Sequence, residues 1–312
     1  MKCKKCGGPA VVNMRQHRLA LCGEHFLEWF VAQTERTIEK HGMFEPDDRV
    51  LVAVSGGKDS LALWDVLTRL GVSADGLYIN LGIRGKEDYS AASQAKAKAF
   101  ASERGLSLQV VDVQGTYGES IPQLAHRTGR GRAKPCSVCG LVKRHVMNRL
   151  TLEGGYAALA TGHNLDDEAA VLMQNTLRWQ TGYLARQSPV LEATQPGLAR
   201  KVKPFCRLYE RETAAYVLVR GIDYIYDECP HATGATSITY KQLLTSLEGR
   251  SPGAKHSFYL DFLRAKRKGQ FQVTAETVEL HPCSECGQPT SAPGRCAFCR
   301  LWEQGLEFGV RS

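Results

Sequence analysis

The chain has 312 residues, 43% of them hydrophobic, which is enough for one sizeable α/β core with small appendages. No apolar run is long enough to cross a bilayer and the first residues lack the apolar segment of a signal peptide, so we expect a soluble cytoplasmic protein without a membrane partner. The net charge is +8, and basic residues gather at 126–134 and 266–268, which favours a polyanionic partner or, alternatively, a solvated basic surface.

The first predicted element is a metal-binding module at the N-terminus. Cys3 and Cys6 are two residues apart, as are Cys22 and His25. Pairs with this gap allow two side chains in a tight turn to bind one metal ion, and four ligands leave no open position. We therefore predict a structural Zn²⁺ site within residues 1–28, a segment with too little apolar area to fold alone.

Residues 49–60 predict a buried strand, a phosphate-binding loop and the start of a helix. The strand ends in Ser-Gly-Gly-Lys-Asp-Ser, where adjacent glycines let the backbone approach an anion and the helix N-terminus supplies N–H donors. A Walker A loop would have Ser or Thr at the position of Asp59, so this loop is of another kind. A carboxylate beside phosphates favours a bound Mg²⁺. The string resembles the PP-loop of the ATP pyrophosphatase superfamily. That resemblance implies ATP binding by Ala53, Val54, Ser55, Gly56, Gly57, Lys58, Asp59 and Ser60.

Strands and helices alternate through the rest of the central segment. Helical spacing and glycine stops predict helices at 58–70, 88–104, 140–152 and 164–179, whereas apolar runs predict strands at 76–81, 106–113 and 156–163. Such alternation predicts an α/β fold with a doubly wound, Rossmann-like parallel sheet. Segment 189–203, which proline and glycine interrupt, is expected to be a loop, and 249–255 a linker.

The turn at 161–167 is predicted to face the same cleft as the PP-loop, because both follow strands of a parallel sheet. Asp166 and Asp167 begin a helix there, where they could simply complement the helix dipole. Next to Gly162, His163 and a nucleotide, they fit better as nucleotide- and metal-binding groups.

Three more cysteines predict a second kind of metal site. Cys136 and Cys139 are two residues apart, and Cys229 lies far along the chain. Three thiolates and a vacant position suit a 4Fe–4S cluster with one open iron. Two alternatives remain: His231 could join them in another structural zinc site, or Cys139 and Cys229 could carry a persulfide through a disulfide. Cys206 has no neighbouring cysteine and is expected to be a buried thiol.

The C-terminal segment contains a third cysteine pattern. Cys283 and Cys286 form one pair and Cys296 and Cys299 another, which predicts a second structural Zn²⁺ site. We therefore expect three parts: an N-terminal zinc finger (1–28), a PP-loop catalytic domain (29–250), and a basic helix with a zinc ribbon (251–312).

Taken together, these motifs resemble one family, the tRNA 2-thiouridine and 2-thiocytidine synthetases, and within it the TtuA type. The resemblance spans essentially the whole chain. It implies that the three central cysteines hold the 4Fe–4S cluster and that Asp59, Lys143 and Asp167 are catalytic. It also implies ATP with Mg²⁺, adenylation of a uracil O2 in tRNA, and sulfur supplied by a thiocarboxylated ubiquitin-like carrier protein. A homodimer is the default assembly.

The expected target is the ribothymidine at tRNA position 54. Three alternatives stay open: the same chemistry at the anticodon wobble uridine, an amidating PP-loop ligase of the NAD synthetase kind, and a zinc-ribbon RNA-binding module with a vestigial ATP loop.

Overall fold

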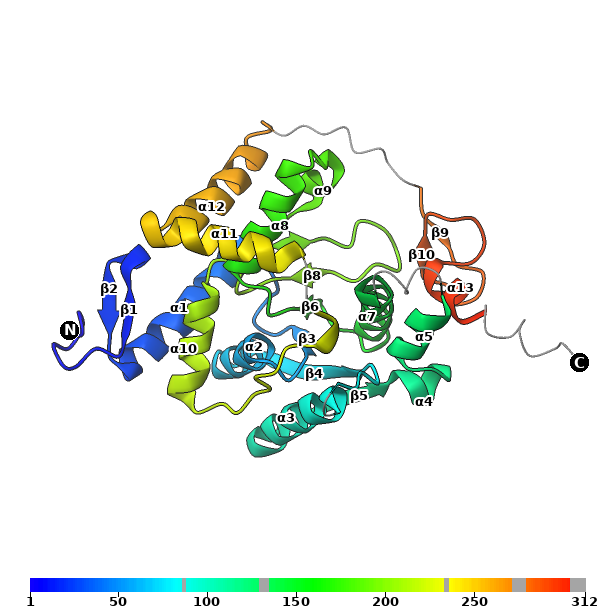
Figure 1. The fold of residues 1–312 in the computed structure, drawn as a ribbon, viewed down its shortest axis with the longest axis horizontal. Helices are drawn as coiled ribbons and strands as arrows, with labels where there is room; N and C mark the ends of the chain where they lie inside the picture. The colour runs from blue at the N-terminus through cyan, green and yellow to red at the C-terminus, as the bar shows by residue number, and fades with distance from the viewer. Residues whose placement is uncertain (86–87, 129–134, 233–235, 271–278, 304–312) are drawn as a thin grey trace, which may run out of the picture.

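The computed structural model describes the chain except for residues 86–87, 129–134, 233–235, 271–278 and 304–312. Its centre is a six-stranded sheet in the order β5–β4–β3–β6–β8–β7, parallel throughout except for the edge pair β8–β7 (Figure 1). The strands are β3 (Arg49–Val54), β4 (Ser73–Asn80), β5 (Leu108–Asp112), β6 (Ala158–Ala160), β7 (Val190–Leu191) and β8 (Lys201–Val202).

The strand order confirms the predicted doubly wound α/β fold. The chain runs outward from β3 through β4 to β5, then returns to β6 on the other side of β3. Loops that leave the carboxyl ends of β3 and β6 therefore diverge at a switch point, where α/β sheets bind ligands.

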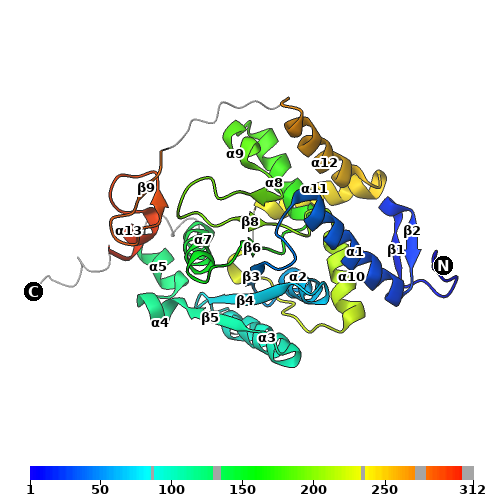
Figure 2. The ribbon, with the colours of Figure 1, turned by 180° about the vertical axis from the view of Figure 1, so that it is seen from behind.

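Helices cover both faces of the sheet, as Figures 1 and 2 show. The main ones are α1 (Gly23–His41), α2 (Lys58–Arg69), α3 (Tyr89–Arg104), α4 (Val113–Tyr117), α5 (Ile121–Arg127), α7 (Pro135–Glu153), α8 (Leu165–Leu177), α9 (Thr181–Arg186), α10 (Glu210–Arg220), α11 (Thr236–Arg250) and α12 (Ala254–Arg267). None of the described helices has the length and apolarity that a bilayer span requires.

Alternate residues of β3 enter two separate cores. Val50 and Val52 pack in the cluster that contains residues of α1, α2, α3 and α10, whereas Leu51 packs with α5 and α7. The indole of Trp64 fills the first core and leaves no room beside Gly76, where an added Cβ would lie 2.4 Å from the ring. Strand residues that are apolar on both faces are typical of a sheet covered on both sides.

Small modules occupy the two ends of the molecule in Figure 1. The N-terminal module pairs β1 (Val12–Met14) with β2 (Leu19–Leu21) around the 3-10 turn η1 (Arg15–His17). The C-terminal module pairs β9 (His281–Pro282) with β10 (Pro289–Thr290) and ends in α13 (Ala297–Glu303). It contacts α7, where Phe298 stacks on His145 with ring centroids 3.6 Å apart.

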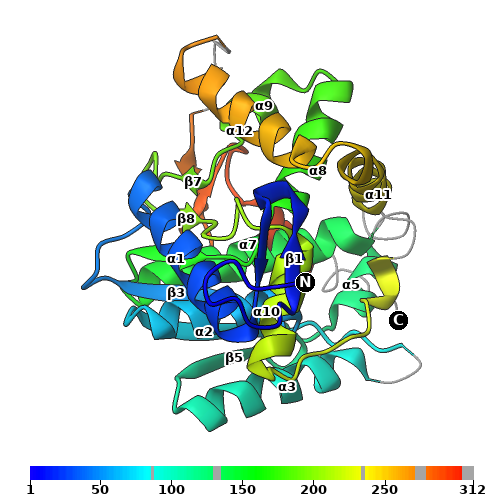
Figure 3. The ribbon, with the colours of Figure 1, turned by 90° about the vertical axis from the view of Figure 1, so that its left-hand side faces the viewer.

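Helices α11 and α12 pack on α8 (Figure 3). Leu244 of α11 is buried against Ala169 and Ala170 of α8. On α12, the Tyr259 hydroxyl donates to the Glu168 carboxylate of α8 at 3.1 Å. These contacts place α12 against the central part of the chain, and the predicted three-part division of the chain remains a prediction.

Several local predictions were wrong. Helix α7 begins at Pro135 instead of Gly140, so Cys136 and Cys139 lie inside its first turns, and proline suits a helix start. Segment 189–203 holds the two-residue strands β7 and β8, which are too short to show a period. Helix α11 was not anticipated, and Lys255 is a buried residue of α12, not part of a linker. Of the predicted basic segment 126–134, residues 129–134 lie outside the described residues.

Candidate active site and metal centres

The PP-loop joins β3 to α2 and has little room for side chains. Gly56 has a φ of +76°, and a Cβ there would lie 2.3 Å from the Ser93 carbonyl oxygen, so this position requires glycine. The backbone N–H of Ser55 donates to the Ser60 hydroxyl at 3.0 Å, and the two hydroxyls are 3.1 Å apart. The loop is thus closed on itself at the N-terminus of α2, the end of a helix that attracts anions.

The structure brings the second predicted loop against the first. A Cβ on Gly162 would lie 2.8 Å from the Asp59 backbone, so glycine permits the close approach. Asn164 caps α8 together with Asp167, and its side-chain amide donates to the Asp59 carboxylate at 3.2 Å. His163, in contrast, is exposed, and its ring nitrogen lies 2.8 Å from the Thr161 hydroxyl.

A chain of alternating charges links the two loops. Lys58 Nζ lies 2.9 Å from both Asp59 and Glu210, and Lys241 Nζ lies 3.0 Å from Glu210 and 2.6 Å from Asp167. Burial disfavours charge on Glu210, but the two lysines outweigh it and lower the pKa of this carboxyl to about 2. Burial raises the pKa of Asp59, and Asp167 and Glu210 add to that rise against the effect of Lys58. Two ammonium groups therefore lie at the junction of the two loops, and each is paired with carboxylates.

Glu210 and Lys241 were not predicted from the sequence. Glu210 is an acid in the first turn of α10, a position that usually only complements the helix dipole. Lys241 lies on α11, whose sequence carries no motif. The Lys241 ammonium reaches Asp167 only because α11 packs on α8.

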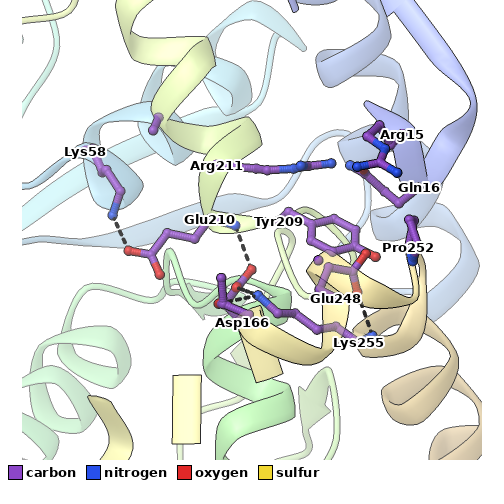
Figure 4. Close-up of a pocket in the computed structure, with 13 residues that line it drawn as sticks. Arg15, Gln16, Lys58, Asp166, Tyr209, Glu210, Arg211, Glu248, Pro252 and Lys255 are labelled. Carbon is purple, nitrogen blue, oxygen red and sulfur yellow. Dashed lines mark hydrogen bonds and ion pairs between the residues drawn. The ribbon is translucent and has the colours of Figure 1, made fainter. Parts of the chain in front are cut away.

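One cavity, of about 470 Å³, opens beside this network (Figure 4). Glu210 reaches from α10 toward Lys58, and below it in this view Asp166 meets Lys255 of α12. One oxygen of Asp166 binds Lys255 Nζ and the other accepts the Glu210 N–H at 2.8 Å. Both oxygens of this predicted ATP-binding residue thus contact protein groups that tie α8 to α10 and α12.

A second cavity also borders the PP-loop. Ser55 lines it together with Cys139, Lys143 and Cys229, and the ends of β3 and β4 form its apolar wall, including Ala53 and Val54. Two of the three central cysteines and the predicted catalytic lysine therefore share a cavity with the nucleotide loop.

The third central cysteine lies close by. The Cys136 thiol donates to the His231 carbonyl oxygen at 3.4 Å, which places it at the turn that follows Cys229. Burial raises the pKa of Cys139, Lys143 opposes the rise, and Cys229 and Cys136 add to it. Three thiols that influence one another, with Lys143 beside them, match the donor set of an iron–sulfur cluster.

The alternative of a third zinc site finds no support in the described part of the chain. There, only the two terminal sets bring at least three ligand atoms within 4.8 Å of one another, and neither includes His231. A single zinc ion needs such close spacing, whereas a cluster offers each thiolate a separate iron.

The two terminal sets have the geometry of closed metal sites. Cys283 and Cys299 have their sulfurs 3.8 Å apart, as do Cys286 and Cys296. Tetrahedral zinc with bonds of about 2.3 Å holds its sulfurs about 3.8 Å apart. At the N-terminus the ligand atoms of Cys3, Cys6, Cys22 and His25 likewise lie within 4.8 Å of one another.

One thiol in each terminal set is prepared for ionisation. Burial opposes ionisation of Cys3, but backbone hydrogen bonds lower the pKa of its thiol to about 6. The same balance lowers the pKa of Cys283 to about 6. Thiolates are the form that binds metal, so both sets could hold Zn²⁺. Cys206, as predicted, is fully buried, and burial raises its pKa to about 12.

Two family matches cover most of the sequence. Residues 2–27 match the N-terminal LIM domain of 2-thiouridine synthetase TtuA, and residues 30–234 match the PP-loop domain. The tRNA-5-methyluridine(54) 2-sulfurtransferase of Thermus thermophilus is 53% identical, with 97% of this chain and 91% of that protein covered. The enzyme of the same name from Pyrococcus horikoshii is 42% identical, over 100% of this chain and 97% of that protein.

A solved structure is also similar. The U34-tRNA thiolase NcsA from Methanococcus maripaludis, determined with its [4Fe-4S] cluster, superposes with a TM-score of 0.76. It is 24% identical and the match covers 89% of this chain and 92% of NcsA. At this identity the likeness confirms the fold.

Proposed function

The chain belongs to the family of tRNA-5-methyluridine(54) 2-sulfurtransferases, and from this premise we propose that it replaces O2 of 5-methyluridine 54 in tRNA with sulfur at the expense of ATP. The observation that carries the proposal is the shared cavity of Ser55, Cys139, Lys143 and Cys229. It puts a nucleotide loop, a cation and two thiols from distant segments within reach of one substrate. An amidating ligase or an RNA-binding module has no need of that combination.

In the first step the uracil O2 attacks the α-phosphorus of ATP. A bond forms between O2 and phosphorus, the bond from that phosphorus to pyrophosphate breaks, and pyrophosphate leaves. The Ser55–Ser60 loop and the α2 N-terminus bind the phosphates, and Lys58 and Lys143 offset their charge. The uracil O2, which is a poor leaving group by itself, can then leave as part of AMP.

The Lys58–Glu210–Lys241 network suggests how the site receives ATP. The phosphates attract Lys58 and Lys241 away from Asp59 and Asp167, and the released carboxylates become available to a cation. Mg²⁺, when bound by Asp59 and Asp167, would supply charge neutralisation at the phosphates. Asn164 keeps Asp59 oriented through its amide hydrogen bond.

In the second step hydrosulfide, released when water cleaves the acyl C–S bond of the carrier's thiocarboxylate and leaves a carboxylate, attacks C2 of the adenylated base and loses its proton. The C2–O bond breaks and AMP leaves with the former O2. Cys136, Cys139 and Cys229 would hold a 4Fe–4S cluster, which when bound supplies a soft Lewis-acid iron for the incoming sulfur. We propose a thiocarboxylated ubiquitin-like carrier protein as the sulfur source and a homodimer as the working assembly.

The terminal modules are proposed to be structural. Each would bind one Zn²⁺ through a complete set of four ligands, so neither offers a position to substrate. The N-terminal module docks on α10, where Gln16 and His17 both contact the buried Glu212 carboxylate. It therefore supports the helix that carries Glu210.

The proposal is tested by anaerobic thiolation of an unmodified tRNA and of tRNA that already carries 5-methyluridine 54. Nucleoside mass spectrometry after digestion identifies the thiolated position. We expect sulfur at position 54, dependent on ATP. Sulfur at position 34 would move the target to the wobble uridine, and ATP-dependent amidation without thiolation would overturn the proposal.

A further inference from the structure

A third cavity, of about 550 Å³, lies between α7, α9, β8 and the C-terminal module. Arg144, Arg186 and Lys201 line it, and no aspartate or glutamate does. In the part of the chain that the structure describes, none of these three cations forms an ion pair with a carboxylate. A cleft lined by charges of one sign concentrates ligands of the opposite sign, so these cations would attract an anion.

The walls of this basic groove are fixed by hydrogen bonds. The buried Asn148 side chain donates to the Gly197 carbonyl at 2.8 Å and accepts from the Ala199 N–H at 2.9 Å. Its amide also contacts Gln288 of the C-terminal module at 3.2 Å. With the Phe298–His145 stack, these contacts hold three segments in one arrangement before any ligand binds. A preformed site loses less entropy on binding.

The positive charges of the groove are not balanced by carboxylates among its lining residues. Lys201 is partly buried, and burial together with the nearby Arg144 lowers its pKa. An anion between the two cations would remove that mutual repulsion. Arg186 is already oriented, because its guanidinium lies 5.1 Å from the centre of the Tyr183 ring.

Helix α7 connects the basic groove to the reaction site. Cys139, Lys143 and Met147, at helical spacing, line the cavity beside the PP-loop. Arg144 and Asn148 line the basic groove from the neighbouring face of the same helix. A ligand in the groove is therefore separated from the predicted catalytic lysine by one helix only, and a long polyanion can occupy both.

One exposed aromatic side chain, Tyr183, lies against the groove residue Arg186, and another, Trp179, precedes it on the same segment. Trp179, in the turn before α9, is 74% exposed, and Tyr183 on α9 is 58% exposed. Aromatic side chains beside cations are the combination with which proteins bind unstacked bases of RNA loops. A small anion would use the cations alone, so the aromatics favour RNA.

We propose that this basic groove binds the sugar–phosphate backbone of the tRNA substrate, with Arg186 and Lys201 contacting phosphates. The proposal rests on the proposed function, since it assigns a binding surface to that substrate. The groove positions the RNA so that a base can reach the Lys143 side of α7.

The test compares two double variants of the full-length, metal-loaded protein by tRNA binding over a salt series. R186Q/K201Q removes two groove cations, and Arg144 is left intact because it neighbours Lys143. R36Q/K98Q removes two exposed cations from α1 and α3 as the matched control. We expect R186Q/K201Q to weaken tRNA binding about 10- to 50-fold near 0.1 M salt and to flatten the log–log salt slope by about 1 to 2.

ATP binding and thermal midpoints accompany the measurement and should be the same in both variants, which shows that the fold and nucleotide site are intact. If R186Q/K201Q binds tRNA like R36Q/K98Q while wild type binds and thiolates it, the groove assignment is overturned and the proposed function stands. If wild type binds no tRNA at all, both fail. Loss of carrier-protein binding with normal tRNA binding would make the groove a protein-binding site and also overturn the proposal.

Discussion

The terminal cysteines and the central cysteines of this chain form sites of two different kinds. Each terminal set gathers four ligand atoms within 4.8 Å of one another, all supplied by one short segment. The central set has three thiols, supplied by the first turns of α7 and by the segment before η2 (Pro230–Ala232), and two of them line the PP-loop cavity. The four ligands of each terminal site are close together in the sequence, whereas the three central thiols are brought together only by the fold. We predict that the first kind maintains structure and that the second kind takes part in the reaction.

The largest effect is expected from Cys229→Ala. Removing this thiol takes away one of three cluster ligands, and we expect tRNA thiolation to fall at least about 1,000-fold, to background. Zinc content should match wild type, because Cys229 belongs to neither terminal set. Cys206→Ala, which removes a buried thiol that belongs to neither terminal set and does not line the PP-loop cavity, is the control and should keep its activity. Wild-type thiolation by the Cys229 variant would remove the distinction between the two kinds of site.

The next largest effect is expected on ATP–pyrophosphate exchange, from Lys241, which was not predicted from the sequence. Lys241→Met removes one of two ammonium groups proposed to receive the phosphates, and we expect ATP–pyrophosphate exchange to fall about 10- to 100-fold. Iron and zinc contents should not change. Lys98→Met, on the exposed face of α3, serves as the control. Exchange within twofold of wild type would show that Lys241 only ties α11 to α8.

A smaller effect on activity, but a clear one on structure, is expected from Cys6→Ser. The variant should bind about one zinc per chain instead of about two, because a closed site with three good ligands loses most of its affinity. The N-terminal hairpin should become sensitive to trypsin at Arg15 and Arg18, while the cluster iron stays. Full zinc content in this variant would contradict the assignment of Cys6 as a ligand.

The smallest effect is expected from a carboxylate that only supports the fold. Asp65 lies on α2, like Asp59, but is buried and accepts from Arg220 at 2.9 and 3.0 Å and from Tyr216 at 2.6 Å. Burial would raise the pKa of Asp65, but Arg220 and Tyr216 outweigh it and lower the pKa. Asp65→Asn should cost about 1–3 kcal/mol of unfolding free energy at pH 7 and leave the metal contents unchanged.

The pH dependence of that cost follows from the lowered pKa. The contribution of Asp65 is complete above the ordinary carboxyl pKa of about 3.9 and is lost as pH falls through its lower folded value. In urea titrations wild type should therefore lose more stability than Asp65→Asn between pH 5 and pH 3. A difference that is constant over this range would show that Asp65 is not ionised in the folded protein.

The parts of this molecule that could be predicted are those that a short stretch of sequence determines. A metal-binding turn is defined by the two-residue gap in Cys3–Cys6 and in Cys283–Cys286. A strand, loop and helix start are defined by the run from Arg49 to Ser60. Neither pattern depends on the rest of the chain. The parallel sheet followed from the alternation of strands and helices, and the structure confirms it.

The parts that sequence analysis missed depend on tertiary contacts. Glu210 and Lys241 sit on helices without a motif and meet only because α10 and α11 pack beside α8. The early start of α7 was not predicted, although Val138, Val142 and Val146 are buried at helical spacing. The basic groove combines residues of three segments, and no single segment shows it.

The central claim is that the three central cysteines hold an iron–sulfur cluster beside the nucleotide loop. The most direct test is anaerobic measurement of iron, acid-labile sulfide and zinc on wild type and on Cys229→Ala. We expect about four iron, about four sulfide and about two zinc per wild-type chain, with iron and sulfide lost and zinc kept in the variant. Full thiolation activity in an iron-free wild-type preparation would contradict it.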